Sequence, residues 1–169
     1  GIDFSKQRVC EIAPQTLKHY GIKFPVRLIR GDMLNTELPE NEYDVALLCQ
    51  SLHHAEAPIT LLKEVKRECG QDANIFVIGE HYFRFSRYWM QVTKHFVKYL
   101  INHKGYRDTR FLIPSYDDLF PPCLVKGDFH YSPQQYMHMF NRVGLDVEAH
   151  VINSQAGIQA YCLKNSSDS

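Results

Sequence analysis

The sequence predicts an α/β domain with a mostly parallel sheet, and two observations support this prediction. Apolar segments with strand-like and helix-like spacing alternate along residues 1–78, as they do in α/β folds. Two strand-like segments, 43–49 and 75–78, are almost continuously apolar, which is typical of strands covered on both faces. With 169 residues, 44% of them hydrophobic, the chain can bury the core of one domain. We therefore expect a single domain over residues 1–169.

The N-terminal elements are predicted from local signals. Residues 1–5, "GIDFS", are typical of a strand end that leads into a helix, because apolar residues precede an N-cap residue type. A helix is expected from there to Gly21, which suits a helix C-terminus. Pro14 should kink or divide this helix because proline lacks a backbone donor. The next strand is expected over residues 26–30.

The middle of the chain changes character. Residues 57–69 carry apolar side chains at helical spacing, with a proline near the start and a glycine after the end, so a helix is expected. Residues 84–104 form a longer amphipathic segment with many aromatic side chains. Residues 111–131 contain three prolines and predict irregular structure.

Regular structure is expected again near the C-terminus. Ser132-Pro133-Gln134-Gln135 combines an N-cap, a first-turn proline and a capping-box glutamine, which predicts a helix that ends near Gly144. Residues 145–151 alternate between apolar and polar, and residues 158–163 form a further strand pattern. Their closeness in sequence predicts an antiparallel hairpin.

The charge balance limits the function classes. Lys plus Arg equals Asp plus Glu at 19 each, so no global field attracts nucleic acid or anionic membranes. One local signal stands out, since seven of the eight Lys, Arg, Asp and Glu residues in 84–110 are basic. This segment could be a lid over an anionic acceptor, a helix that contacts lipid, a nucleic-acid contact, or a helix that only packs on the sheet.

The five cysteines are scattered and include no CxxC pair, which favours small buried thiols in a reducing compartment. No apolar run reaches the length of a membrane span. These patterns predict a cytoplasmic protein with no zinc site.

Four stretches in this order resemble the class I S-adenosylmethionine-dependent methyltransferases of the small-molecule branch. They are "GIDFS", "RLIRGDMLNTELPENEYDVALL", "CQSLHHAEAPITLLKEVKREC", and "FNRVGLDVEAHVI" with "GIQAYCLKN". The resemblance implies a Rossmann-like sheet that ends in an antiparallel hairpin. It also implies that the family's first strand and Gly-rich loop would precede Gly1, so we expect a fragment that is truncated at its N-terminus. Loss of that central strand should leave a gap in the sheet or force its neighbours to pair.

The resemblance implies S-adenosylmethionine as cofactor and assigns residues to it. Asp3 would bind the ribose hydroxyls, and Phe4 would lie against the adenine. Asp32 would bind the adenine amino group, with Met33 on the ring. Gln50 and Ser51 leave the fourth family strand where cofactor and acceptor should meet. Each has a plainer alternative: Asp3 suits a helix N-terminus, Phe4 suits a core, and Gly31-Asp32 suits a turn.

Histidines and one acid follow the buried strands. Methyl transfer is an in-line displacement, so positioning supplies most of the catalysis, and a base is needed only if the acceptor must lose a proton. His53 and His54 could be that base because histidine titrates near neutral pH, and Glu80 and His81 are further candidates. The histidines could equally be polar loop residues.

The sequence thus predicts methyl transfer to a small-molecule acceptor, with 84–131 as an insertion or lid. Arg84, Arg87 and Tyr88 are the expected acceptor-binding residues. Two other functions stay open: a non-catalytic methyltransferase-like binding or scaffold domain, and an NAD-dependent oxidoreductase, against which the C-terminal hairpin counts.

Overall fold

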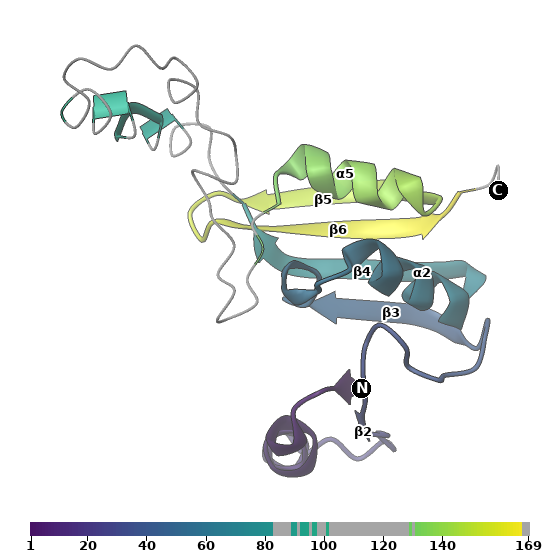
Figure 1. Cartoon of the computed structure of the whole chain (residues 1–169). Coiled ribbons are helices and arrows are strands. Elements are labelled where there is room, and N and C mark those ends of the chain that lie inside the picture. The colour runs from purple at the N-terminus through teal and green to yellow at the C-terminus, as the bar shows by residue number, and fades with distance from the viewer. Residues whose placement is uncertain are drawn as a thin grey trace.

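The computed structural model describes residues 1–82, 89–90, 92–94, 96–97, 101, 129 and 131–166. Arg84, Arg87, Tyr88 and most of the predicted lid therefore lie outside the described residues. In chain order, the elements are β1 (Ile2–Asp3), the π-helix η1 (Arg8–Ile12), α1 (Ala13–His19), β2 (Ile29–Arg30), β3 (Tyr43–Cys49), the 3-10 helix η2 (Leu52–His54), α2 (Pro58–Glu68), β4 (Cys69–His81), α5 (Pro133–Arg142), β5 (Leu145–Asn153) and β6 (Ile158–Asn165) (Figure 1).

The larger sheet has four strands in the order β3-β4-β6-β5. β3 and β4 are parallel, and both pairings of β6 are antiparallel, which confirms the predicted C-terminal hairpin. The strict alternation expected for 145–151 is interrupted by a register shift between Val147 and Ala149. A bulge of this kind moves the following side chains to the opposite face.

A second, two-stranded sheet is formed by β1 and β2, which are parallel. The strand expected over residues 26–30 is only Ile29–Arg30, because β1 offers a register of two residue pairs. Pro14 does not interrupt the helix: the backbone stays helical from η1 into α1, and the hydrogen-bond pattern changes from π to α between Ile12 and Ala13, just before Pro14.

The two sheets do not pair with each other. Among the described residues, no strand is hydrogen-bonded to the edge of β3 away from β4, or to the edge of β1 away from β2. Figure 1 shows β1 and β2 below β3, set apart from the larger sheet. The described residues thus have a gap between β1 and β3, one of the two arrangements that the resemblance implied.

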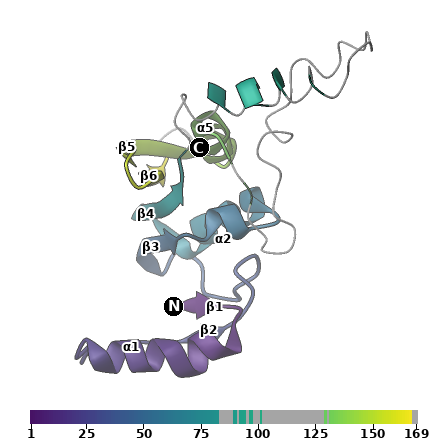
Figure 2. The same ribbon diagram turned by 90° about the vertical axis from the view of Figure 1, so that its left-hand side faces the viewer.

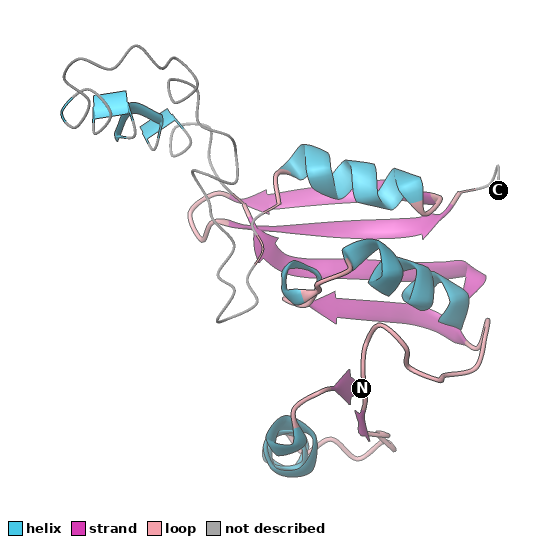
Figure 3. Cartoon of the chain, viewed as in Figure 1, coloured by secondary structure: helices cyan, strands magenta, loops and turns pink. Residues whose placement is uncertain are grey.

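Both described helices of the larger sheet lie on the same face of it (Figures 1, 2 and 3). Leu61, Leu62 and Val65 of α2 and Tyr136 and Phe140 of α5 are buried there. They pack with inward side chains of the strands; this shared cluster includes Leu48, Ile75, Val77, Leu145, Tyr161 and Leu163. The opposite face carries no described helix, and strand residues such as Val45, Leu47 and Val151 stay exposed.

A polar clamp fastens the segment after β2 to α2. Thr36 donates its backbone N–H to Glu64 at 3.0 Å, and its hydroxyl contacts both Glu64 and Glu68. Arg67 donates two N–H groups to the Glu64 carboxylate, at 2.8 and 3.0 Å. The Arg67 hydrogen bond lowers the pKa of Glu64 to about 2, whereas burial raises the pKa of Glu68. These contacts hold the loop that follows Asp32 against α2.

Candidate functional site

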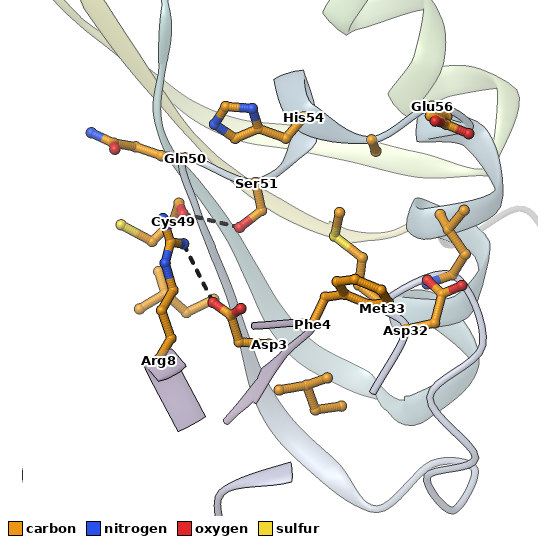
Figure 4. A pocket seen from close by; sticks show the side chains of 14 residues that line it. Asp3, Phe4, Arg8, Asp32, Met33, Cys49, Gln50, Ser51, His54 and Glu56 are labelled. Atoms are coloured by element: carbon orange, nitrogen blue, oxygen red, sulfur yellow. Dashed lines mark hydrogen bonds and ion pairs between the residues drawn. The ribbon is translucent and has the colours of Figure 1, made fainter. Parts of the chain in front are cut away.

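A pocket of about 790 Å³ lies where β1, β2 and β3 end. This volume is in the range of small-molecule sites, and the carboxyl edge of parallel strands is where open α/β sheets bind ligands. All six residues predicted to hold the cofactor line it: Asp3, Phe4, Asp32, Met33, Gln50 and Ser51 (Figure 4). The structure therefore brings together residues that are up to 48 positions apart in sequence, from 3 to 51.

Asp3 stands at the end of β1 with its carboxylate at the pocket. Its Oδ1 accepts the backbone N–H of Ser5 at 2.7 Å, which shapes the turn into η1. Its Oδ2 lies 3.4 Å from Nη1 of Arg8, whose side chain is 71% exposed. A contact this long and exposed is weak, so Oδ2 can exchange it for a ligand hydroxyl at small cost.

Asp32 occupies the corresponding place after β2. Its Oδ1 accepts the N–H of Leu34 at 2.8 Å in a local turn, the plain role that a Gly-Asp step also predicted. Met33 is partly buried against the core, while Phe4 is 77% exposed. Phe4 therefore has no core role in the described structure, and its ring is presented at the pocket.

The exit of β3 is held in an unusual backbone conformation. Gln50 has a φ of 51°, and its N–H donates to Ile78 of β4 at 2.8 Å. Its side chain covers Gly79, whose φ is 75°, and a Cβ added at Gly79 would lie 2.7 Å from Cγ of Gln50. Only glycine fits under Gln50 in this conformation. The pair turns Ser51 and the residues after it toward the pocket.

Glu80 and His53 form a buried pair behind this exit. Glu80 has no exposed surface and His53 is 4% exposed. The Glu80 carboxylate accepts the backbone N–H groups of Leu52 and His53 at 3.2 and 3.1 Å. Nδ1 of His53 lies 2.8 Å from Oε2 of Glu80, and the Tyr136 hydroxyl donates to the same oxygen at 2.8 Å.

The four predicted catalytic residues lie close together but not equivalently. The His53 ring is 4.2 Å from the His54 ring and 4.4 Å from the His81 ring, centroid to centroid. His54 lines the pocket, whereas His53 and Glu80 do not. The structure thus places His54 at the pocket and Glu80 in a supporting position behind it.

Sequence reasoning missed several residues of this region. Arg8, Cys49 and Glu56 line the pocket, and Tyr136 completes the Glu80 contacts. Cys49 and Cys10 are exposed, contrary to the expectation of buried thiols. Tyr136 sits in an amphipathic helix, where an aromatic residue predicts core packing, so no sequence signal marked its hydroxyl.

Neither a metal-binding cluster nor a membrane-spanning helix is present among the described residues. They contain no group of three or more His, Cys, Asp or Glu side chains arranged to hold a metal ion. Within the same part of the chain, no helix is long and apolar enough to cross a membrane.

Comparison with known proteins supports the predicted resemblance and the fold. Residues 1–77 match the family model of the methyltransferase domain. The chain also superposes on solved structures of S-adenosylmethionine-dependent methyltransferases over almost its whole length. The predicted resemblance to class I methyltransferases is confirmed. No curated protein sequence matches the chain significantly.

Three solved structures illustrate the similarity of this chain to known methyltransferase folds. The mitomycin 7-O-methyltransferase MmcR has a TM-score of 0.64 at 16% identity, over 98% of this chain and 42% of that one. The magnesium protoporphyrin IX methyltransferase ChlM from Synechocystis PCC 6803, whose structure holds S-adenosylhomocysteine, has a TM-score of 0.63 at 10% identity, over 98% and 63%. The cyclase SpnF has a TM-score of 0.67 at 13% identity, over 98% and 65%. The chain spans less than two thirds of each of these proteins.

These similarities establish the Rossmann-like methyltransferase fold, and the family match supports the predicted cofactor, S-adenosylmethionine. They do not identify the reaction, because one of the three neighbours is named for a cyclisation. The reaction must be inferred from the residues at the pocket.

Proposed function

We infer that this chain belongs to an enzyme that transfers the methyl group of S-adenosylmethionine to a small-molecule acceptor. The observation that carries this inference is the pocket: all six residues that the family resemblance assigns to the cofactor line one cavity. These residues lie at or just after the ends of three different strands, so it is the fold that brings them together.

The pocket residues suit an adenosyl ligand chemically. Asp3 and Asp32 line the pocket, and each uses Oδ1 in a local turn, so we assign the second carboxylate oxygen of each to the ligand. A carboxylate oxygen can accept hydroxyl or amino donors, which the ribose and the adenine of an adenosyl ligand offer. Phe4 and Met33 add an aromatic ring and a polarizable side chain for the base.

The methyl donor carries the reactive group. The residues of this chain orient the donor and the acceptor, and they accept a proton from the acceptor. We assign His54, at the pocket, and His53 and His81, in ring contact with each other behind it, as the groups that can accept a proton from the acceptor. Glu80 supports His53. Arg84, Arg87 and Tyr88 remain the proposed acceptor-binding residues, on the sequence argument alone.

Titration calorimetry with S-adenosylhomocysteine tests the assignment of Asp3. Asp3→Asn keeps the shape of the side chain but removes its charge and one acceptor oxygen. We expect it to weaken binding by about 1–3 kcal/mol, or roughly 5- to 150-fold. Asp44→Asn is the matched control, because Asp44 is an exposed residue at the start of β3 and does not line the pocket.

Equal weakening by both variants, or none by Asp3→Asn, would overturn the assignment of Asp3. Absence of binding by the folded wild-type protein would overturn the proposed function itself.

A second candidate is a domain that binds the cofactor without turnover. One observation favours it: no described strand closes the space between β1 and β3, beside the pocket. Measurable affinity for S-adenosylhomocysteine without methyl transfer to any acceptor in a panel of small hydroxyl and amine compounds would select it.

A further inference from the structure

Glu80 is a carboxylate with no solvent exposure, surrounded by donors. Two backbone N–H groups, of Leu52 and His53, point at it from η2. Tyr136 of α5 adds a hydroxyl from another layer of the fold. Burial and the nearby Glu80 charge raise the pKa of Tyr136 far above its usual value, so its hydroxyl keeps its proton.

These partners define the proton positions of the pair. Backbone N–H groups can only donate, and the Tyr136 hydroxyl donates to Oε2, as His53 N–H does. An oxygen that accepts two hydrogen bonds and also carried the proton would be a poor acceptor, so Oε2 carries no proton. Nδ1 of His53 must then be the donor at 2.8 Å, which leaves the lone pair of the neutral ring on Nε2.

We propose that Tyr136 is a positioning residue that keeps Glu80 ionised, so that His53 holds its proton on Nδ1 and takes up a further proton on Nε2. When the pair gains one proton, it can sit on His53, as an imidazolium beside a carboxylate, or on Glu80, as a neutral pair. A hydrogen bond to the carboxylate favours its charged form. Tyr136 therefore shifts the proton to the ring.

The fold fixes Tyr136 for this role from two sides. The capping box of Ser132 and Gln135 sets the first turn of α5 immediately before Tyr136. The Tyr136 ring packs against Tyr131, Phe140 and Tyr161 at centroid distances of 5.6 to 6.3 Å. The chain just ahead of α5 also reaches η2 directly, because Phe129 N–H donates to the His53 carbonyl at 2.8 Å.

The catalytic value of this arrangement rests on the proposed function, in which a histidine after β3 accepts the proton of the acceptor. The proton positions do not rest on it. The titratable groups that face the pair are His54 on η2, His81 on β4 and Tyr136 on α5. Tyr131 and Tyr161 are also near, and burial together with the Glu80 charge raises the pKa of each.

Nitrogen-15 NMR of the histidine rings tests the proposal on the protein without cofactor or acceptor. In wild type, Nδ1 of His53 should stay protonated throughout an acid titration, while Nε2 becomes protonated. Tyr136→Phe keeps the ring packing but removes the hydroxyl. In the pair that has gained one proton, we expect the ratio of protonated Glu80 to protonated His53 to rise about tenfold. The NMR spectrum would show this as loss of the proton from Nδ1.

Tyr161→Phe is the matched control. It also removes one buried hydroxyl from the same aromatic cluster, but that hydroxyl donates to Gln159 at 2.8 Å and not to Glu80. An unchanged Nδ1 signal in Tyr136→Phe would overturn the proposal, and so would an equal change in Tyr161→Phe, which would indicate general loosening.

Glu80→Gln gives a second test should Tyr136→Phe fold poorly. Its amide oxygen should take the place of Oε2, where the His53 backbone N–H and the Tyr136 hydroxyl donate, so Nδ1 of the neutral His53 ring should keep its proton. Loss of the Nδ1 proton in this variant would contradict the assigned contacts. Failure of methyl transfer with these NMR results intact would count against the proposed function and not against Tyr136.

Discussion

The N-terminal part of the chain and the four-stranded sheet differ sharply in how they are held. Within residues 1–42, which precede β3 and are all described, no residue is buried. Every buried apolar residue of the described structure lies between Leu48 and Leu163. The candidate cofactor pocket nevertheless takes residues from both parts. In this chain, therefore, the residues that would bind the ligand and the residues that stabilise the fold are largely separate sets.

Two phenylalanines give the most severe test of this comparison. Phe140 on α5 has no exposed surface, and Phe24, before β2, is 67% exposed. Phe140→Ala should lower the free energy of unfolding by about 3–5 kcal/mol, because it removes a buried ring and leaves a cavity. Phe24→Ala should change it by less than about 0.5 kcal/mol. Urea unfolding measures both, and similar losses in the two variants would show that Phe24 stabilises the fold as much as Phe140 does.

The polar clamp joins the two parts and should respond to pH. The pKa of Glu64 falls from 4.5 to about 2 on folding, so its contribution is fully present above about pH 4.5 and is lost as the pH falls toward 2. The raised pKa of Glu68 acts in the opposite direction, since its contribution is lost as the pH rises. Glu64→Gln should lower the unfolding free energy by about 1.5–3 kcal/mol at neutral pH, the value of hydrogen bonds to a charged group.

Urea unfolding of wild type and Glu64→Gln between neutral pH and pH 2.5 checks this. The difference between the two should shrink as the pH falls. Glu11→Gln, on exposed η1, is the control and should match wild type at each pH. A difference that stays constant with pH would mean that the Glu64 charge is not what Arg67 and Thr36 stabilise.

Two serines provide the smallest expected effect. Ser132 caps α5 by accepting the N–H of Gln135 at 3.3 Å, and Ser5 accepts the N–H of Arg8 at 3.3 Å before η1. Ser132→Ala should cost about 1 kcal/mol of unfolding free energy, because α5 packs on the core. Ser5→Ala should leave global unfolding unchanged while helical content near η1 falls. Equal effects of the two changes on the unfolding midpoint would contradict the separation of the two parts.

Local patterns were sufficient for most elements. The capping signal at Ser132, the apolar spacing over residues 57–69 and the apolar run of residues 43–49 predicted α5, α2 and β3 closely. The positions of these elements were predicted because capping and residue spacing depend on neighbours within a few residues. The burial on both faces that was expected for residues 43–49 was wrong, since only Leu48 of β3 is buried. The strand at 26–30 was predicted too long, because strand length depends on the partner strand, and β1 offers only two pairs.

The candidate site was predicted in part. Asp3, Asp32 and Ser51 could be chosen because strand ends in a parallel sheet meet at one edge, and the family resemblance assigned them to the cofactor. The separate roles of His53 and His54 could not be predicted, since adjacent residues differ here in whether they face the pocket or the Glu80 carboxylate. Arg8 and Tyr136 also carried no local signal.

The sequence alone therefore determined the order of strands and helices, the family resemblance and the acids after the first two strands. These features depend on composition, spacing and residue type along the chain. The tertiary structure determined that Glu80 is buried, that His53 contacts its carboxylate and that Tyr136 donates a hydrogen bond to it. Hydrogen bonds between residues 53, 80 and 136 exist only once β4, η2 and α5 are packed together, and no local pattern encodes that arrangement.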